Sequence, residues 1–179
     1  MEKPVVYYGS SITHGGCVSR PGMAYQNIVS RHFDCDHINL GFSGSAKGEE
    51  NMANYIASLD MSMFVLDYDH NAPTTEHLEA THENFFKIIR KAHPDLPIIM
   101  MPRPSIFPNV NVDKRREVIE KTYNNAIAAG DKNVYYITSR KLCELCGTEG
   151  TVDGCHPTDF GFASMAKAII ETIEENKIL

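Results

Sequence analysis

Residues 4–11 read Pro-Val-Val-Tyr-Tyr-Gly-Ser-Ser, and this stretch decides the fold of the 179-residue chain. Its apolar part, Pro4–Tyr8, holds β-branched and aromatic residues without a polar interruption, which is typical of a strand buried on both faces. Gly9 follows, and a residue without a side chain lets the backbone leave the strand in a tight turn. The stretch therefore predicts a buried strand that ends beside two hydroxyl groups, those of Ser10 and Ser11.

The rest of the chain repeats this pattern, with helices in between. Four further short apolar runs predict strands at His37–Leu40, Met63–Leu66, Pro97–Met101 and Asn133–Ile137. Apolar residues at helical spacing predict helices at Met23–Phe33, Thr75–Ala92, Asp113–Ala129 and Thr158–Ile173. The last two of these begin with residue types that cap helix amino termini well, Asp113 and Thr158.

Buried strands that alternate with helices indicate a parallel sheet that is covered on both faces. With right-handed crossovers, the expected fold class is α/β: a three-layer α/β/α sandwich around a flavodoxin-like, doubly wound parallel sheet of about five strands. The chain shows no internal repeat, low-complexity tract or polar linker. Residues 1–179 are therefore expected to form a single domain.

The composition excludes several classes of protein. Hydrophobic residues make up 42% and charged residues 22% of the chain, which is ordinary for a globular protein and argues against disorder. Seventeen Lys and Arg stand against 23 Asp and Glu, and a net charge of −6 argues against a nucleic-acid partner. No apolar run approaches the ~20 residues of a membrane span and no secretory signal is present, so we expect no membrane partner and a cytoplasmic location for the chain as written.

The five cysteines favour reduced thiols over a disulfide framework, because their number is odd and no secretory signal accompanies them. One alternative is a zinc site formed by Cys143 and Cys146 with Cys155 or His156. A single Cys-x-x-Cys pair is only half of a structural zinc signature, and neighbouring residues do not easily face one ion. The favoured interpretation is a pair of small residues that closes a short helix after the fifth strand.

Ligands of doubly wound sheets bind at the carboxyl ends of the strands, so the loops there are the expected site. Ser11, after the first strand, is a candidate nucleophile whose own backbone N–H faces a developing oxyanion. Gly44, after the second strand, offers a backbone N–H that no side chain covers. Asn71, after the third strand, offers a side-chain amide as a further donor. Taken singly, each loop is also an ordinary polar turn.

A fourth loop precedes the last helix and reads Asp153-Gly154-Cys155-His156-Pro157. Asp and His three residues apart, in a turn set by Gly and Pro, bring the carboxylate behind the imidazole. The carboxylate then holds the ring tautomer and offsets the charge formed when the ring takes a proton. The chain order Ser, Asp, His is the one expected when a doubly wound sheet carries a catalytic triad.

These loops resemble the SGNH hydrolase superfamily, the GDSL-type lipases and esterases. The first block appears as Gly9-Ser10-Ser11, with Ser in place of the usual Asp before the nucleophile, and the second as Asn39–Gly44. The block Asp153–Pro157 is the strongest match. The third block departs, because the family commonly shows Gly-x-Asn-Asp and this chain has Asp-His-Asn-Ala at 69–72, so the chain is a divergent member.

The resemblance implies a serine esterase that removes small acyl groups, acetyl above all, from esters such as acetylated carbohydrates. It implies Ser11, Asp153 and His156 as the catalytic residues and Ser11, Gly44 and Asn71 as the oxyanion hole. It also implies that neither a metal nor an organic cofactor takes part.

Two other interpretations remain open from the sequence. One is a flavin- or phosphate-binding module of the same fold, in which the loop 9–16 forms a nest for an anion. That interpretation leaves the block Asp153–Pro157 unexplained. The other is a binding domain stabilised by zinc at the cysteine pair described above.

Overall fold

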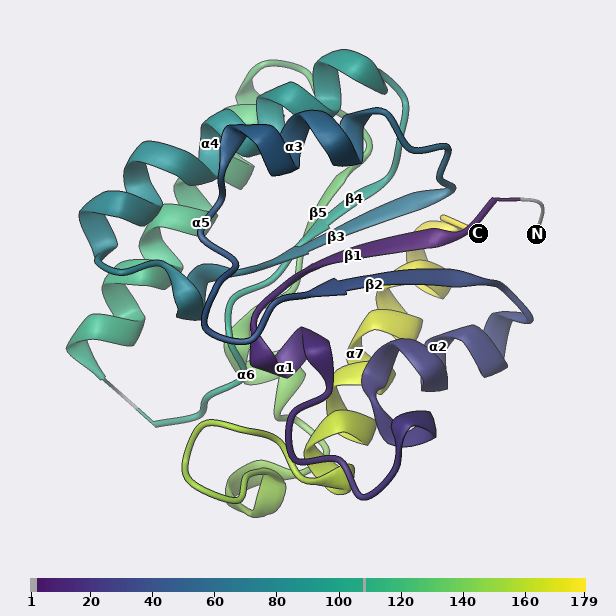
Figure 1. The fold of residues 1–179 in the computed structure, drawn as a ribbon, viewed down its shortest axis with the longest axis vertical. Coiled ribbons are helices and arrows are strands. Elements are labelled where there is room, and N and C mark those ends of the chain that lie inside the picture. The colour runs from purple at the N-terminus through teal and green to yellow at the C-terminus, as the bar shows by residue number, and fades with distance from the viewer. Residues whose placement is uncertain (1–2, 108) are drawn as a thin grey trace.

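The computed structural model describes residues 3–107 and 109–179 of the chain. A five-stranded sheet forms its centre (Figure 1), and all neighbouring strands pair in parallel in the order β2-β1-β3-β4-β5. The strands are β1 Val5–Gly9, β2 His37–Gly41, β3 Met63–Asp67, β4 Ile98–Met100 and β5 Val134–Tyr136. This order is that of flavodoxin-like doubly wound sheets and confirms the predicted fold class.

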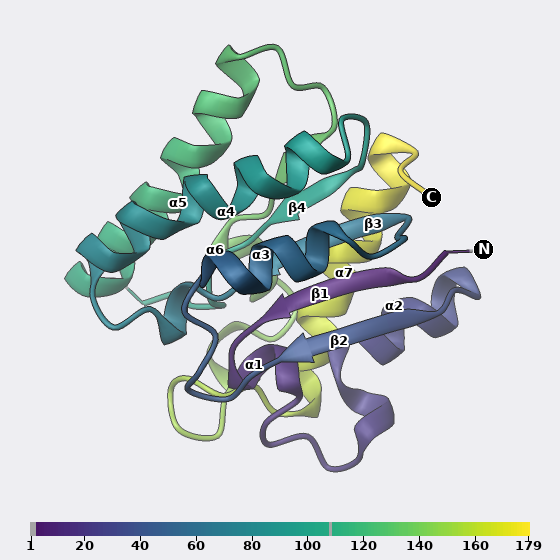
Figure 2. The same ribbon diagram turned by 45° about the horizontal axis from the view of Figure 1, so that its top comes forward.

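Helices cover both faces of the sheet, as Figures 1 and 2 show. The α-helices are α1 Ser11–His14, α2 Tyr25–Phe33, α3 Glu50–Ala57, α4 Thr75–Ala92, α5 Val110–Ala128, α6 Ser139–Leu142 and α7 Asp159–Asn176. Three short 3₁₀ helices are η1 Pro21–Met23, η2 Asp69–Asn71 and η3 Gly147–Gly150. Among the described residues, no helix combines the length and the apolar character that crossing a membrane requires.

The core consists of two apolar layers that the sheet separates. On β1, Val6 and Tyr8 point into the layer beneath α3, α4 and α5, whereas Val5 and Tyr7 point into the layer beneath α2 and α7. Successive residues of a strand face opposite sides, so a strand that is covered on both sides has to be apolar throughout. All five residues of β1 are buried, which explains the uninterrupted apolar run in the sequence.

Two helix starts differ in how well the sequence predicted them. Helix α7 is capped by Thr158 as predicted, because its hydroxyl accepts a hydrogen bond from the backbone N–H of Gly161 at 3.2 Å. Helix α5 begins three residues before the predicted start at Asp113, and its cap is Asn109. The Asn109 side chain accepts hydrogen bonds from the backbone of Asn111 and Val112, whereas Asp113 accepts one from the backbone of Asn109.

Helix α1 lies directly across the carboxyl ends of β1 and β2. A Cβ atom on Gly9 would lie 2.0 Å from Thr13 Oγ1 and 2.2 Å from the carbonyl oxygen of Asp67. A Cβ atom on Gly41 would lie 2.1 Å from the backbone nitrogen of His14. The two strand-ending glycines therefore serve a packing need: they leave the space in which the short helix with Ser11 lies.

We predict that Gly9→Ala lowers the free energy of unfolding by about 3 kcal/mol, because the added methyl group overlaps a backbone carbonyl that cannot move aside. Gly22→Ala is the matched control, since the nearest atom to a Cβ there is the flexible end of Arg31 at 3.5 Å. We expect that control to change stability by no more than about 0.5 kcal/mol. Urea unfolding of both variants measures the difference, and equal losses would contradict the packing argument.

Candidate active site

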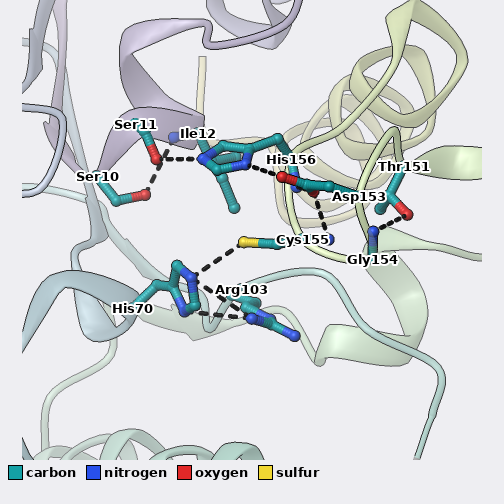
Figure 3. A network of polar contacts seen from close by, with 10 residues as sticks. All are labelled: Ser10, Ser11, Ile12, His70, Arg103, Thr151, Asp153, Gly154, Cys155 and His156. Carbon is teal, nitrogen blue, oxygen red and sulfur yellow. Dashed lines mark hydrogen bonds and ion pairs between the residues drawn. The ribbon is translucent and has the colours of Figure 1, made fainter.

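Ser11, His156 and Asp153 form a continuous hydrogen-bonded chain (Figure 3). The Ser11 hydroxyl, on the first residue of α1, lies 2.9 Å from Nε2 of His156. Nδ1 of the same ring lies 2.7 Å from Oδ2 of Asp153. The structure thus brings together three residues that the sequence predicted as a triad, from loops at opposite ends of the chain. Their catalytic roles stay a prediction.

The turn that contains Asp153 and His156 holds itself in shape. Oδ1 of Asp153 accepts hydrogen bonds from the backbone N–H groups of Cys155 at 2.9 Å and His156 at 2.7 Å. Gly154 has a φ of +78°, a conformation that favours glycine. The hydrogen bond from the His156 ring, and next the one from the His156 backbone, lower the pKa of Asp153 to about 2. The carboxylate is therefore ionised at neutral pH and available to orient the ring.

Three side chains from three elements fix α1 behind Ser11. The Thr13 hydroxyl donates to Oδ2 of Asp67, at the end of β3, over 2.9 Å. The Thr13 carbonyl accepts from the amides of Gln26 at 2.7 Å and Asn39 at 2.9 Å. A helix of four residues leaves its last carbonyl groups without partners of its own, and these bonds satisfy one of them. This network was not predicted from the sequence, although Asp67, a charged residue directly after a buried apolar run, was a signal for it.

Asp67 is a buried carboxyl group with only 1% of its surface exposed. Burial, and after it the nearby Asp69 carboxylate, raise the pKa of Asp67 well above its ordinary value, although the hydroxyls of Thr13 and Tyr25 oppose the shift. Tyr25 donates to the same oxygen as Thr13, at 3.2 Å. The native state therefore favours the protonated form of this group.

The two loops predicted to complete an oxyanion hole lie against each other. Gly44 sits in a turn with a φ of +71°, in which the backbone N–H groups of Ser45 and Ala46 donate to the Phe42 carbonyl. The side-chain amide of Asn71 donates to that same carbonyl at 2.9 Å. An amide has two N–H bonds, so one remains to bind a substrate oxygen. The arrangement ties the Asn71 donor to the turn that carries Gly44.

The divergent third block forms η2 and contacts the turn that contains Asp153 and His156. Asp69, which stands where the family has glycine, is 2% exposed and accepts a hydrogen bond from the backbone of Arg103 at 3.1 Å. His70 Nε2 lies 3.0 Å from Sγ of Cys155, the residue before His156 (Figure 3). Burial, and then Arg103 and Arg115, lower the pKa of His70 to about 4. The ring is therefore neutral at neutral pH and packs between the catalytic turn and Arg103.

The described residues do not assemble the predicted zinc alternative. The metal-ligating side chains that lie within 4.8 Å of one another are those of Asp153, Cys155 and His156, and both ring nitrogens of His156 are already engaged. Cys143 and Cys146 are buried free thiols outside that group.

The loop 9–16, which an anion nest would need, is folded into α1. The Ser10 hydroxyl accepts the hydrogen bond from the backbone N–H of Ile12 at 3.1 Å. The helix then ends at Gly15, whose N–H donates to the Ile12 carbonyl. The loop is consequently shaped to present the Ser11 hydroxyl, and this geometry argues against a loop that binds a phosphate group.

The model of the GDSL-like lipase/acylhydrolase family matches residues 2–174. This chain belongs to that family. Membership confirms the resemblance to SGNH hydrolases, the GDSL-type lipases and esterases. No match to this sequence was found among curated proteins.

Several solved structures share the fold. A protein of Bacteroides ovatus ATCC 8483 assigned as a GDSL-like lipase is 34% identical with a TM-score of 0.87, and the match covers 99% of this chain and 54% of that one. The salicylyl-acyltransferase SsfX3 of a tetracycline biosynthetic pathway is 22% identical with a TM-score of 0.85, over 100% of this chain and 56% of that one. A family two carbohydrate esterase of Clostridium thermocellum, in complex with cellohexaose, is 16% identical with a TM-score of 0.78. That match covers 100% of this chain and 66% of the esterase. The last two show the fold alone, and the chain spans about half the length of the first two.

We predict that Asp67→Asn changes how the stability of the protein depends on pH. A raised native pKa means that the stabilising contribution of Asp67 is complete below about pH 4, its unfolded value, and is lost as the pH rises through the native pKa. An amide does not titrate. The free energy of unfolding of the wild type, relative to that of the variant, should therefore fall as the pH rises from 5 to 8, as measured by urea unfolding.

Asp153→Asn is a control for which the pH dependence of the free energy of unfolding has the opposite sign. The pKa of Asp153 is lowered, so its contribution is present above its unfolded pKa and is lost only as the pH falls toward about 2. A wild-type advantage over Asp67→Asn that rises with pH between 5 and 8 would contradict the assignment of a protonated buried carboxyl group.

Proposed function

We propose that this chain is a serine esterase in which Ser11 is the nucleophile, His156 the general base and Asp153 the residue that orients the ring. The observation that carries the proposal is the unbroken chain from the Ser11 hydroxyl to the imidazole to the carboxylate, at 2.9 and 2.7 Å. Family membership supports the same reaction class. A hydroxyl beside a base that a third group orients is the arrangement that nucleophilic catalysis needs.

The proposed reaction proceeds in two halves. Ser11 Oγ attacks the ester carbonyl while His156 Nε2 takes the hydroxyl proton, and the carbonyl oxygen becomes an oxyanion. The backbone N–H groups of Ser11 and Gly44 and the free N–H of Asn71 stabilise that charge. His156 gives its proton to the leaving alcohol, which leaves the acyl group on Ser11. Water then attacks the acyl group by the same steps and releases the acid.

We propose small acyl esters, acetyl esters of carbohydrates above all, as the substrates. Cavities of about 240 to 660 Å³ occur in the described part of the chain, and Ser11 lines none of the five found. The cavity of about 550 Å³ lies at the amino ends of β4 and β5, away from the catalytic edge of the sheet. Structural neighbours include a carbohydrate esterase in complex with cellohexaose and an esterase active on acetylated mannans. Residues 1–179 are proposed to act as one catalytic domain.

We predict that Ser11→Ala and His156→Ala each reduce kcat for p-nitrophenyl acetate by at least about 10³, and that Asp153→Asn costs up to about 10⁴. Ser58→Ala is the control, because Ser58 is an exposed serine at the end of α3 whose hydroxyl bonds only to the Tyr55 carbonyl in its own helix. Thermal unfolding of each variant confirms that the fold is retained. A folded His156→Ala enzyme that keeps more than a tenth of wild-type activity would contradict the assignment of the triad.

We also predict that kcat/KM is at least about tenfold higher for p-nitrophenyl acetate than for p-nitrophenyl octanoate. A pocket that buried the longer chain would gain about 0.8 kcal/mol for each CH₂, whereas neither Ser11 nor His156 lines any of the five cavities described above. Steady-state kinetics over the acyl series from two to eight carbons measures the preference. Faster turnover of the octanoyl ester would overturn the small-acyl assignment.

A further inference from the structure

A small cavity of about 240 Å³ adjoins the catalytic loops and has no part in the triad chemistry. His70, Arg103 and Arg115 line one part of it, and Asn109, Asn111 and Val112 at the start of α5 line the rest. His70 connects the cavity to the site in two ways. It directly precedes Asn71 in the chain, and its ring contacts Cys155, which directly precedes His156. A group bound in the cavity therefore lies beside the loops that hold the reacting ester.

The charge of this cavity is positive, although the chain as a whole carries −6. Within the described residues, neither Arg103 nor Arg115 forms an ion pair with a carboxylate. Burial raises the pKa of the buried Asp69 to about 6, although the charges of Arg115 and Arg103 oppose the shift. Asp113 at the start of α5 is already paired with Arg116 at 2.7 Å. The residues that line the cavity therefore include two guanidinium groups and no carboxylate.

Hydrogen bonds orient the two arginines but do not use all of their guanidinium N–H groups. Arg115 donates from Nη2 to the Ala72 carbonyl at 2.9 Å and from Nη1 to the Asp69 carbonyl, which orients its guanidinium group. Arg103 directs Nη1 at the ring of His70, and its buried Nε has no hydrogen-bond acceptor among the described residues. A guanidinium group has five N–H donors, and a buried donor without an acceptor is costly. An anion with several acceptor oxygens in the cavity would be a partner for the Nη donors that the protein leaves without an acceptor.

Two further observations agree with a positive environment. After burial, the largest causes that lower the pKa of His70 are the charges of Arg103 and Arg115, so the ring already experiences their field. The amino terminus of α5, a helix of 19 residues, borders the same cavity and adds a partial positive charge.

We propose that this cavity binds an anionic oxygen group, a carboxylate or a phosphate, carried by the ester substrate. The inference rests on the proposed esterase function and narrows it: the chain prefers esters that are themselves anions. Arg103 and Arg115 supply the charge and the forked donors that suit either group. His70, uncharged, supplies the wall between the anion and the catalytic turn.

The experiment compares three acetyl esters that differ in one substituent: 4-acetoxybenzoate, 4-acetoxyphenyl phosphate and the neutral 4-acetoxybenzamide. We expect the wild type to turn over one of the two anions with a kcat/KM at least about tenfold above that of the amide, and which of them it prefers separates carboxylate from phosphate. Arg103→Gln should reduce this ratio by about tenfold, whereas Arg103→Lys, which keeps the charge, should retain part of it. Arg31→Gln, an exposed arginine on α2, removes the same charge elsewhere and should leave the ratio as it is.

A binding measurement distinguishes failure of this inference from failure of the proposed esterase function. Calorimetric titration of the wild type with benzoate and with inorganic phosphate needs no turnover, and Arg115→Gln gives a second variant if Arg103→Gln does not fold. Binding that Arg103→Gln or Arg115→Gln weakens, in a protein that hydrolyses none of the three esters, would support the cavity and reject the esterase. Equal turnover of all three esters without measurable binding of either anion would overturn the proposal. Equal effects of Arg103→Gln and Arg31→Gln on the ratio would do the same.

Discussion

The close contact between α1 and the ends of β1 and β2 is the constraint on which the site depends. Gly9 and Gly41 leave no room for even a methyl group, so the four-residue helix lies flat on the edge of the sheet. The buried bond from Thr13 to Asp67 then fixes it to β3. Ser11 opens this helix, and its position relative to His156 follows from that packing. The Ser11 hydroxyl is thereby positioned by the edge of the sheet.

The sequence predicted the sheet well because the signal for buried parallel strands is local. All five apolar runs became strands within one residue at either end, since each residue of β1 faces one of two buried layers. Short elements carry less information. Helix α3 buries only Ala53 and Ile56, too few to establish a helical period, and the sequence did not predict it. The cap of α5 was misplaced because both Asn109 and Asp113 are good capping residues, and only the hydrogen bonds distinguish them.

The site divides in the same way. The turn with Asp153 and His156 was predictable because its hydrogen bonds join residues three positions apart. The contacts of Thr13 with Asp67, 54 residues away, and of His70 with Cys155, 85 residues away, leave no pattern along the chain. The third block shows the same difficulty. Asp69 in place of a glycine looks like a lost motif in the sequence, whereas in the structure it is a buried carboxyl group that the Arg103 backbone and Arg115 accommodate.

The separation of 145 residues between Ser11 and His156 has a consequence for the order in which the molecule is assembled. The pair of Asp153 and His156 belongs to one turn and needs few other contacts to form. The approach of the serine hydroxyl to the imidazole instead closes almost the entire length of the polypeptide, and α7, which follows His156, packs with α2 in one layer of the core. During synthesis on the ribosome, a chain that has just exposed Ser11 carries an inert alcohol. In the proposed mechanism it becomes a nucleophile only once His156 reaches it, so esterase activity would appear only after the two ends of the chain have come together.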